Sequence, residues 1–446
     1  MLKNSLKILF FFWTISVSVA LANEYSAKNG MVVSAHPMAS EFGIEILKSG
    51  GNAVDAAVGT AILAGVVEPH ASGLGGGGGM LVYLHDADSL TYINYYQQAV
   101  SNVPENFDRL KESNSARAIL VPGTVAGLHF ALTHYGTFSW KDLLLKAIAK
   151  VEKGVPVDEF FHNIIFNSYE KLMQFPETQQ IYLPDQLPPE VGDTLVNNRV
   201  LETLKKLAEN GPDIFYKGEI ADSIEAKVQR YGGTLRKKDL MNYRIRQLNP
   251  LRGSYRNFSI ATAPPPQSGA TVLEILNILE LKDLSKWGSF ETNPQTFHFM
   301  AETMKRAYAD RLAYLGDPKF ASIPTETLIT KTFARSRFET IDFLKANPAN
   351  PKKTNPGKID IRKPKQEKIN GSTTHISVID KDGNAVSVTQ TLNRFWGCGL
   401  SVCGFLLNNG MTSFSPMSQI NNAEPNKQPR STISPSILFK DGKVAI

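Results

Sequence analysis

Two short runs of alternating apolar and polar residues, joined by a tight turn, constrain the fold more than any other feature. Residues 374–380 and 385–391 each alternate with a period of two, and a turn at 381–383 separates them. This pattern predicts a β-hairpin whose three-residue loop needs Gly383 in the left-handed conformation. The hairpin is therefore the best-defined structural unit of the sequence.

The loop length also predicts how the two strands pair. If Asp380 pairs with Asn384, Thr373 lies opposite Thr391 on the same face, and Asn393 is the diagonal neighbour of Thr373. A hydroxyl and an amide then converge on Thr373. A two-residue loop would shift this pairing and separate the three side chains.

Thr373 stands where a linker meets the hairpin. Residues 344–372 are rich in Pro, Asn and Lys and predict an exposed linker. A threonine hydroxyl is a weak nucleophile, but a free α-amine on the same residue, with a pKa of about 8, can act as its base. That amine becomes free only when the bond between Ser372 and Thr373 is cut. The alternative is a plain strand in which threonine serves β-propensity.

The first residues predict a targeting signal. Lys3 and Lys7 precede an apolar run at 8–19, and an Ala-Leu-Ala cleavage site follows. A membrane anchor is the alternative, but the run is short for one. We expect residues 1–22 to be a signal peptide and the mature chain to be periplasmic or secreted.

Composition excludes several classes of protein. The 446 residues include 42% apolar and 20% charged residues, which is globular usage. Only Cys398 and Cys403 are present, so a disulfide scaffold is excluded, although one disulfide between them and two free thiols both stay open. The eight histidines form no metal-binding motif, and we expect no metal and no organic cofactor. The basic run within the linker lacks aromatic residues, which favours a solvated linker over a nucleic-acid site.

Long helical patterns and short hairpins occur together along the chain. Helices are predicted in 36–68, 123–174, 200–231, 270–281 and 297–314, and strands in 80–84, 90–96 and 255–263. This mixture indicates a layered α+β fold rather than repeated βαβ units.

Several stretches carry a resemblance to a known family. They lie at residues 51–57, 68–69, 72–78, 122–127, 264–269, 307–311, 373–375, 406–409, 425–427 and 434–435. On these stretches the chain resembles the γ-glutamyltransferases (glutathione hydrolases), which are self-processing N-terminal-nucleophile hydrolases. The glycine run within 73–79 lacks the Gly-Lys-Ser/Thr of a phosphate loop, and the resemblance makes it a close-packed turn.

The resemblance implies an αββα four-layer sandwich of two stacked, mainly antiparallel sheets between helical layers. It implies cleavage between Ser372 and Thr373 into a large chain, residues 23–372, and a small chain, residues 373–446. Thr373 is then the nucleophile that attacks a γ-glutamyl amide such as glutathione, and water or an amino-acid or peptide acceptor takes the acyl group. Neither nucleic acid nor a membrane beyond export is an expected partner.

The resemblance also assigns roles to other residues. Thr391 is expected to hydrogen-bond to Thr373, and substrate binding is expected from four residues: Asn393, Ser413, Ser431 and Thr432. Tyr96 replaces the family's carboxylate-clamping arginine, and Gly410 and Ser413 replace residues that bind the substrate's ammonium group. A tyrosine cannot form the bidentate ion pair of an arginine.

The end of the sequence raises a further expectation. The chain stops at Ile446, just after a hairpin turn at Asp441 and Gly442. The small chain is therefore expected to be incomplete, with the glycine pair of the family's oxyanion hole lying beyond it. Two alternatives stay open: a related acylase or amidase whose acyl donor lacks a zwitterionic head, and a non-catalytic homologue.

Overall fold

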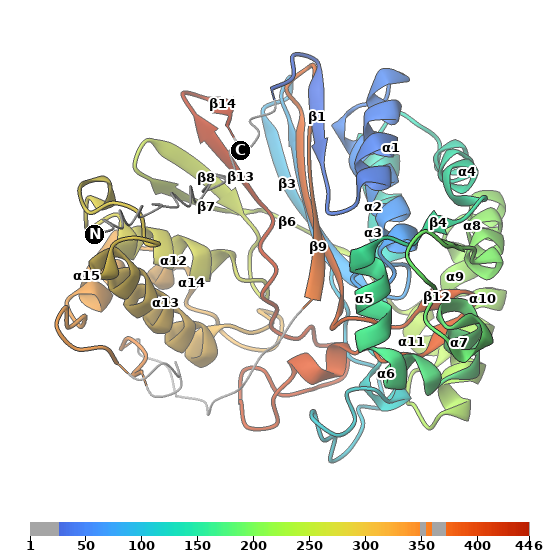
Figure 1. The fold of residues 1–446 in the computed structure, drawn as a ribbon. Coiled ribbons are helices and arrows are strands. Elements are labelled where there is room, and N and C mark those ends of the chain that lie inside the picture. Colours follow the sequence, from blue (N-terminus) through green and yellow to red (C-terminus); the bar gives the residue numbers. More distant parts are fainter. Residues whose placement is uncertain (1–25, 348–353, 359–371, 446) are drawn as a thin grey trace, which may run out of the picture.

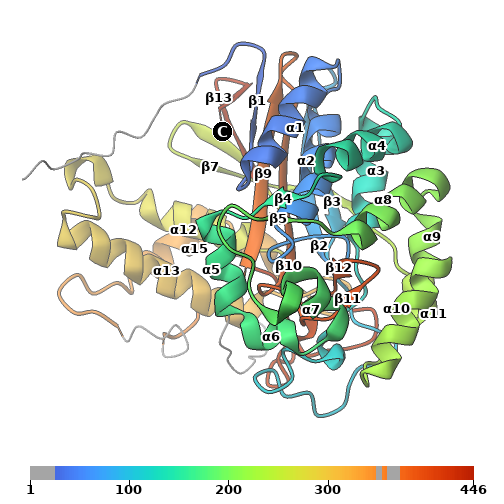
Figure 2. The same ribbon diagram turned by 45° about the vertical axis from the view of Figure 1, so that its right-hand side comes forward.

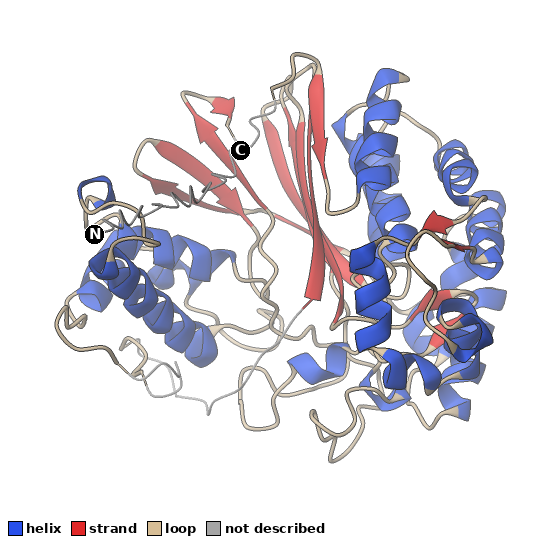
Figure 3. Ribbon diagram, viewed as in Figure 1, coloured by secondary structure: helices blue, strands red, loops and turns tan. Residues whose placement is uncertain are grey.

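The computed structural model describes residues 26–347, 354–358 and 372–445. The predicted signal peptide, 1–22, and most of the segment before Ser372 lie outside the described residues. Two antiparallel sheets face each other, and helices cover the outer face of each (Figures 1 and 3). The predicted four-layer αββα sandwich is confirmed.

The larger sheet has six strands in the order β1-β9-β10-β2-β3-β6, and every neighbouring pair in it is antiparallel. Its strands are β1 (Gly30–Val33), β2 (Gly77–Leu84), β3 (Ser89–Tyr95), β6 (Arg246–Leu248), β9 (Ser372–Asp380) and β10 (Ala385–Asn393). The predicted hairpin forms β9 and β10, with Gly383 at φ +85°. The Asp380 amide donates to the Asn384 carbonyl at 3.1 Å, as the three-residue loop predicts.

The smaller sheet has the order β14-β13-β8-β7. Its strands are β7 (Leu251–Tyr255), β8 (Phe258–Thr262), β13 (Ser436–Lys440) and β14 (Lys443–Val444). The predicted strand at 255–263 corresponds to β8, but sequence patterns missed its partner β7. Two small ladders lie outside the sandwich: β4 (Val155–Pro156) pairs with β5 (Thr194–Leu195), and β11 (Ser401–Val402) with β12 (Phe405–Leu406).

Helices α1–α11 lie on the side of the larger sheet (Figures 1 and 2). They are α1 (Pro37–Lys48), α2 (Ala53–Val67), α3 (Thr124–Tyr135), α4 (Trp140–Val151), α5 (Glu159–Asn167), α6 (Tyr169–Met173), α7 (Pro176–Tyr182), α8 (Asn198–Asn210), α9 (Asp213–Tyr216), α10 (Glu219–Arg230) and α11 (Lys237–Met241). Helix α2 is almost entirely buried because it is rich in Ala and Val. Asn52 and Asp55 form the capping box that begins it.

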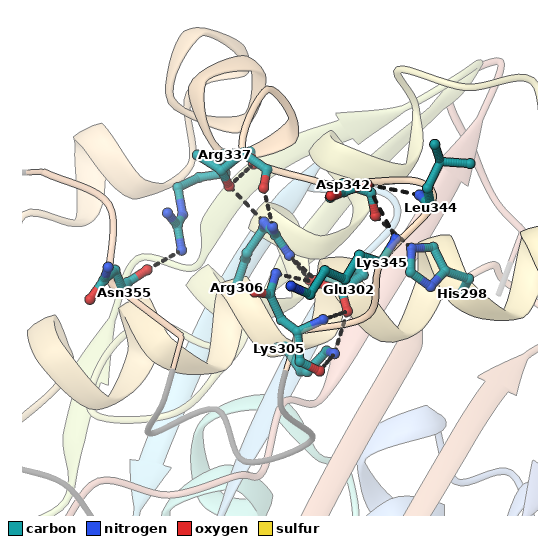
Figure 4. Close-up of polar contacts among 11 residues, drawn as sticks. His298, Glu302, Lys305, Arg306, Arg337, Asp342, Leu344, Lys345 and Asn355 are labelled. Carbon is teal, nitrogen blue, oxygen red and sulfur yellow. Dashed lines mark hydrogen bonds and ion pairs between the residues drawn. The ribbon is translucent and has the colours of Figure 1, made fainter.

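Four helices cover the smaller sheet: α12 (Gly269–Leu279), α13 (Pro294–Tyr314), α14 (Thr325–Leu328) and α15 (Lys331–Phe338). Buried charges tie α13 to the chain that follows α15. Glu302 accepts a hydrogen bond from Arg306 at 2.6 Å (Figure 4). It accepts a second one from the Asn347 backbone amide at 3.0 Å. Burial alone would raise the pKa of Glu302, but hydrogen bonds from Lys305, Asn347 and Arg306 lower it to about 2.

The described parts of the predicted linker are only partly exposed. Leu344 is fully exposed, whereas Thr354 and Gly357 are buried. Arg337 donates to the Asn355 carbonyl at 2.9 Å (Figure 4), and Tyr314 donates to the Gly357 carbonyl at 2.5 Å. The predicted exposure is found at Asn355 and Lys358 but not at Thr354 and Gly357, and polar contacts with α13 and α15 hold this part of the chain.

The glycine run also differs from the close-packed turn that we expected. Gly77, Gly78 and Gly79 begin strand β2 instead of forming a turn. The close packing itself is present, since a Cβ atom on Gly79 would lie 1.8 Å from the Tyr92 hydroxyl and one on Gly75 would lie 2.1 Å from the Leu406 carbonyl. Among the described residues, no helix is long and apolar enough to cross a membrane.

Candidate active site

Thr373 is the second residue of β9, directly after Ser372. Its side chain is exposed, whereas Thr374 beside it is buried. It lines a cavity together with the five other residues that were predicted to be catalytic or substrate-binding: Thr391, Asn393, Ser413, Ser431 and Thr432. We call this cavity the nucleophile pocket.

The pairing of β9 with β10 follows the prediction along most of the hairpin. It runs from Ala385 opposite Ile379 to Gln390 opposite Thr374, and then shifts so that Asn393 faces Ser372. The expected direct pairing of Thr373 with Thr391 is wrong because β10 contains a bulge at this point. Asn393 takes a positive φ of 83°, a conformation that asparagine tolerates better than most residues.

The bulge directs the Thr391 hydroxyl toward the backbone of β9. Thr391 Oγ1 donates to the Ser372 carbonyl oxygen at 2.5 Å, and it accepts from the Asn393 backbone amide at 2.7 Å. Because the amide occupies the acceptor side of the hydroxyl, the hydroxyl proton points at the carbonyl. That carbonyl belongs to the peptide bond between Ser372 and Thr373.

Asn393 is fixed by its side-chain amide. Its Nδ2 donates to Thr412 Oγ1 at 2.7 Å and to the Asn409 carbonyl at 3.1 Å, and its Oδ1 accepts from Ser413 Oγ at 2.6 Å. Thr412 and Ser413 belong to a short 3-10 turn, η5 (Gly410–Ser413). The network holds the bulge against this turn and places Ser413 next to Asn393.

Ser431 and Thr432 reach the pocket from the segment before β13. The Ser431 amide donates to the Pro266 carbonyl at 3.0 Å, and the Ser268 hydroxyl donates to the Ser431 carbonyl at 2.6 Å. The Pro-rich turn that leads into α12 therefore supports this wall of the pocket. Ser431 is buried and Thr432 is exposed.

Tyr96 occupies the pocket at the position where the resemblance implied an arginine. Its side chain is only 2% exposed. Burial raises the pKa of Tyr96, and hydrogen bonds with Ser431 and Ser413, together with the charge of Arg311, partly offset this effect. Tyr96 thus remains a neutral hydroxyl that joins two of the predicted binding residues. Of the other two replacements, Ser413 lines the cavity and Gly410 does not.

Four arginines line the nucleophile pocket and were missed by sequence analysis: Arg109, Arg311, Arg394 and Arg430. The sequence could have indicated Arg311 and Arg430, since Arg311 is the last residue of the motif at 307–311 and Arg430 directly precedes Ser431. Arg109 and Arg394 lie in loops, where no motif indicated a role for them. None of the described residues lining the pocket is an aspartate or a glutamate. The pocket is therefore cationic and suits an anionic group.

The nucleophile pocket is narrow in this uncut chain. Its free volume is about 20 Å³, room for one or two water molecules at about 10–15 Å³ each. An acyl chain the length of a glutamyl group needs more room.

The cysteines lie apart from this pocket. Cys398 is a buried free thiol, and Cys403 is a half-buried one. Burial raises the pKa of the Cys398 thiol to about 11, so it is protonated at neutral pH. Among the described residues, no group of three or more His, Cys, Asp or Glu side chains could hold a metal ion.

Comparison with known proteins places this geometry in a family. Residues 39–446 match the family profile described as Gamma-glutamyltranspeptidase. The chain belongs to the γ-glutamyltranspeptidase family. The glutathione hydrolase proenzyme of Bacillus subtilis (strain 168) is 38% identical over 93% of this chain and 74% of that protein. The corresponding proenzyme of Escherichia coli (strain K12) is 39% identical over 94% of this chain and 74% of that protein.

A solved structure gives the same fold. The cephalosporin acylase from Bacillus halodurans superposes with a TM-score of 0.81 at 27% identity, covering 96% of this chain and 78% of that one. The resemblance drawn from sequence motifs is therefore confirmed, and the chain is related to proteins named glutathione hydrolases and to a cephalosporin acylase. The roles of individual pocket residues stay predictions.

Proposed function

We propose that this chain is a proenzyme that cuts itself between Ser372 and Thr373 and then uses Thr373 to cleave γ-glutamyl amides. The observation that carries the proposal is the Thr391 hydroxyl, which donates to the Ser372 carbonyl oxygen at 2.5 Å beside the Thr373 side chain. A hydrogen-bond donor at this oxygen stabilises the negative charge that develops when the carbonyl carbon is attacked.

Self-cleavage then follows as an acyl shift. Thr373 Oγ bonds to the Ser372 carbonyl carbon, the bond to the Thr373 nitrogen breaks, and the hydroxyl proton ends on that nitrogen. Water hydrolyses the resulting ester. The products are a carboxylate on Ser372 and a Thr373 that carries both a hydroxyl and a free α-amine. The large chain is then 23–372 and the small chain begins at Thr373.

The same side chain performs the second reaction. The free α-amine takes the proton from Thr373 Oγ, which attacks the amide carbon of a substrate such as glutathione. The amine of the substrate takes up this proton and leaves, and the acyl group stays bound to Thr373 Oγ. Water or an amino-acid or peptide acceptor then removes the acyl group from Thr373. We place Asn393, Ser413, Ser431 and Thr432 around the acyl group. No step of this scheme requires a cofactor. Export guided by residues 1–22, to the periplasm or beyond, belongs to the same proposal.

The mass of the purified protein tests the proposal. The native chain is expected to yield two fragments that meet at Ser372 and Thr373, while Thr373→Ala stays intact and inactive toward γ-glutamyl anilide. Thr373→Ser keeps a hydroxyl and is the matched control, expected to cut itself slowly. An uncut native chain, or a cut Thr373→Ala chain, would overturn the assignment.

A second candidate function is favoured by the composition of the pocket. Tyr96 replaces the expected arginine, and the described lining has four arginines but no carboxylate to pair with a substrate ammonium. An acyl group that has a carboxylate and no ammonium, such as glutaryl, suits this lining, and a solved relative is named a cephalosporin acylase. Anilide release from glutaryl and γ-glutamyl substrates separates the two candidates.

A further inference from the structure

The loop that follows β10 reaches the nucleophile pocket with a strained backbone. We call residues 393–399 the strained loop, because four of them have a positive φ, between 54° and 87°: Asn393, Trp396, Gly397 and Gly399. A bulky residue such as Trp396 rarely adopts this conformation. Strain of this kind persists only where contacts from outside enforce it, and it is common near functional sites. Asn393 and Arg394, at the start of the loop, both line the pocket.

One set of outside contacts fixes Trp396. Its backbone amide donates to the His70 carbonyl at 2.7 Å. Its ring is fully buried and lies against the rings of Phe161 and Tyr182, with centroids 6.3 and 4.9 Å away. These contacts hold the middle of the strained loop, but they do not engage the carbonyl groups on either side of Trp396.

Lys171 in helix α6 binds those two carbonyl groups. Its Nζ donates to the Phe395 carbonyl at 2.7 Å and to the Gly397 carbonyl at 2.6 Å. Burial lowers the pKa of Lys171 to about 8, while Cys398 raises it and the charge of Arg394 lowers it. Lys171 is therefore mainly charged at neutral pH, and a charged donor forms stronger hydrogen bonds than a neutral one. A single ammonium group thus holds the backbone on both sides of Trp396.

The backbone connects this contact to Arg394. The Gly397 amide donates to the Arg394 carbonyl at 2.8 Å. The Arg394 amide donates to Asn409 Oδ1 at 3.1 Å, and the same oxygen accepts from Asn393 Nδ2 at 3.2 Å. Arg394 thus lies between the turn that Lys171 holds and the network that fixes Asn393. Arg394 Nε is buried and makes no hydrogen bond within the described residues, so an anion would give it a partner.

We propose that Lys171 is a positioning residue, which holds the strained loop so that Arg394 meets the anionic part of the acyl donor. This proposal rests on the proposed function, because the acyl donor has to bind in the nucleophile pocket. Lys171 does not line that pocket and acts only through the loop. A displaced guanidinium loses the paired hydrogen bonds that it makes with a carboxylate, whereas Thr373 and Thr391 stay in place on β9 and β10. Loss of Lys171 should therefore weaken substrate binding more than it slows the chemistry.

A double-mutant cycle tests the connection between Lys171 and Arg394. Lys171→Met keeps the length of the side chain but removes its charge, and is expected to raise KM for γ-glutamyl anilide on the order of tenfold while kcat changes less than about twofold. In an Arg394→Gln background the same substitution should change KM less than about twofold, because the group that Lys171 positions is absent. Lys171→Arg retains a charged donor and should restore most of the affinity. Equal effects in the two backgrounds, an unchanged KM, or a fall in kcat alone would overturn the proposal.

Lys331→Met is the matched control. Lys331 also donates to a backbone carbonyl, that of Ser254 at 3.0 Å, but it lies in α15 on the outer side of the smaller sheet and does not line the nucleophile pocket. Its loss is expected to leave KM for γ-glutamyl anilide unchanged. A rise in KM equal to that of Lys171→Met would show a general effect of removing a lysine and contradict the proposal.

Hydrogen exchange separates failure of this proposal from failure of the proposed function, because it needs no turnover. In the uncut Thr373→Ala chain, Lys171→Met is expected to speed amide exchange in residues 394–399 on the order of tenfold, since a loop released from its carbonyl contacts opens more often. Lys171→Arg and Lys331→Met should leave this exchange close to its original rate. Unchanged exchange in Lys171→Met contradicts the role of Lys171 alone, whereas an uncut native chain contradicts the proposed function.

Discussion

The nucleophile pocket and the cavity between residues 103–110 and 411–423, which we call the loop groove, meet at Arg109 and Arg394 but are built in opposite ways. The first has about 20 Å³ of free volume and a polar lining whose side chains are hydrogen-bonded to each other. The second has about 770 Å³ and apolar side chains that are partly exposed. Fixed hydrogen bonds suit a site where atoms react, since catalysis depends on exact placement. Apolar side chains on loops form no such network, and methionine in particular can adapt its shape.

The largest expected effect comes from the hydrogen bond at the bond to be cut. Thr391→Val keeps the shape of the side chain but removes the hydroxyl that donates to the Ser372 carbonyl. We expect self-cleavage to slow by about 10²–10³-fold, the cost of losing one donor to a developing oxyanion. The measurement is the rate at which the two fragments appear on a denaturing gel. Thr391→Ser retains the hydroxyl and should cut at close to the native rate; equal slowing of both variants would assign Thr391 a packing role.

A stability measurement compares the two cavities more directly. Asn393→Ala removes the hydrogen-bond partner of the Thr412 and Ser413 hydroxyls. It also places an alanine at a φ of 83°. In the uncut Thr373→Ala background we expect a loss of about 2–4 kcal/mol in the free energy of unfolding. Asn106 also has a positive φ, 50°, but is exposed in the loop groove. Asn106→Ala should therefore cost only about 1 kcal/mol. Equal losses in urea unfolding would show that the Asn393 network adds no stability.

Asn393 also marks the point up to which the site could be predicted from sequence. The turn at Gly383 determines pairing as far as Gln390, because turn geometry and alternation are local properties. The bulge at Asn393 depends on Asn409, Thr412 and Ser413, which follow it by up to twenty residues, so no local pattern reveals it. The motifs brought Thr391, Ser431 and Thr432 into the predicted site because they are short and local.

The loops behave differently from the strands. Arg109 and Arg394 lie in segments without periodicity, and only the folded chain brings them to one wall. Strand β7 was missed for a related reason: its sequence Leu-Arg-Gly-Ser-Tyr has polar residues on the exposed positions and a glycine at its centre, which weakens the strand signal. Prediction was therefore reliable where short-range chemistry decides the structure and failed where distant contacts decide it.

A smaller effect is expected from a charge added to the pocket. Ser413→Asp would place a carboxylate where the described lining has none, next to Asn393. A substrate ammonium could then pair with it, so we expect the preference for γ-glutamyl over glutaryl anilide to rise by about tenfold, or roughly 1.4 kcal/mol. The measurement is the ratio of kcat/KM for the two anilides. Ser285→Asp is the control, because Ser285 is exposed and does not line the nucleophile pocket. It adds the same charge and should leave the ratio unchanged. An unchanged ratio in Ser413→Asp would exclude an ammonium position beside Asn393.

The smallest expected effect concerns the stability of the loop groove. Leu110→Ser and Met417→Ser change side chains that are already largely exposed, so each should alter the free energy of unfolding by no more than about 0.5 kcal/mol. Thermal unfolding of the uncut Thr373→Ala chain measures this change. A larger loss would mean that the two side chains hold the loops together. If stability is unchanged in these variants while it falls in Asn393→Ala, the two cavities differ as their linings predict. Hydrogen bonds then hold the nucleophile pocket in one shape, and the exposed apolar surface of the loop groove adds no stability to the fold.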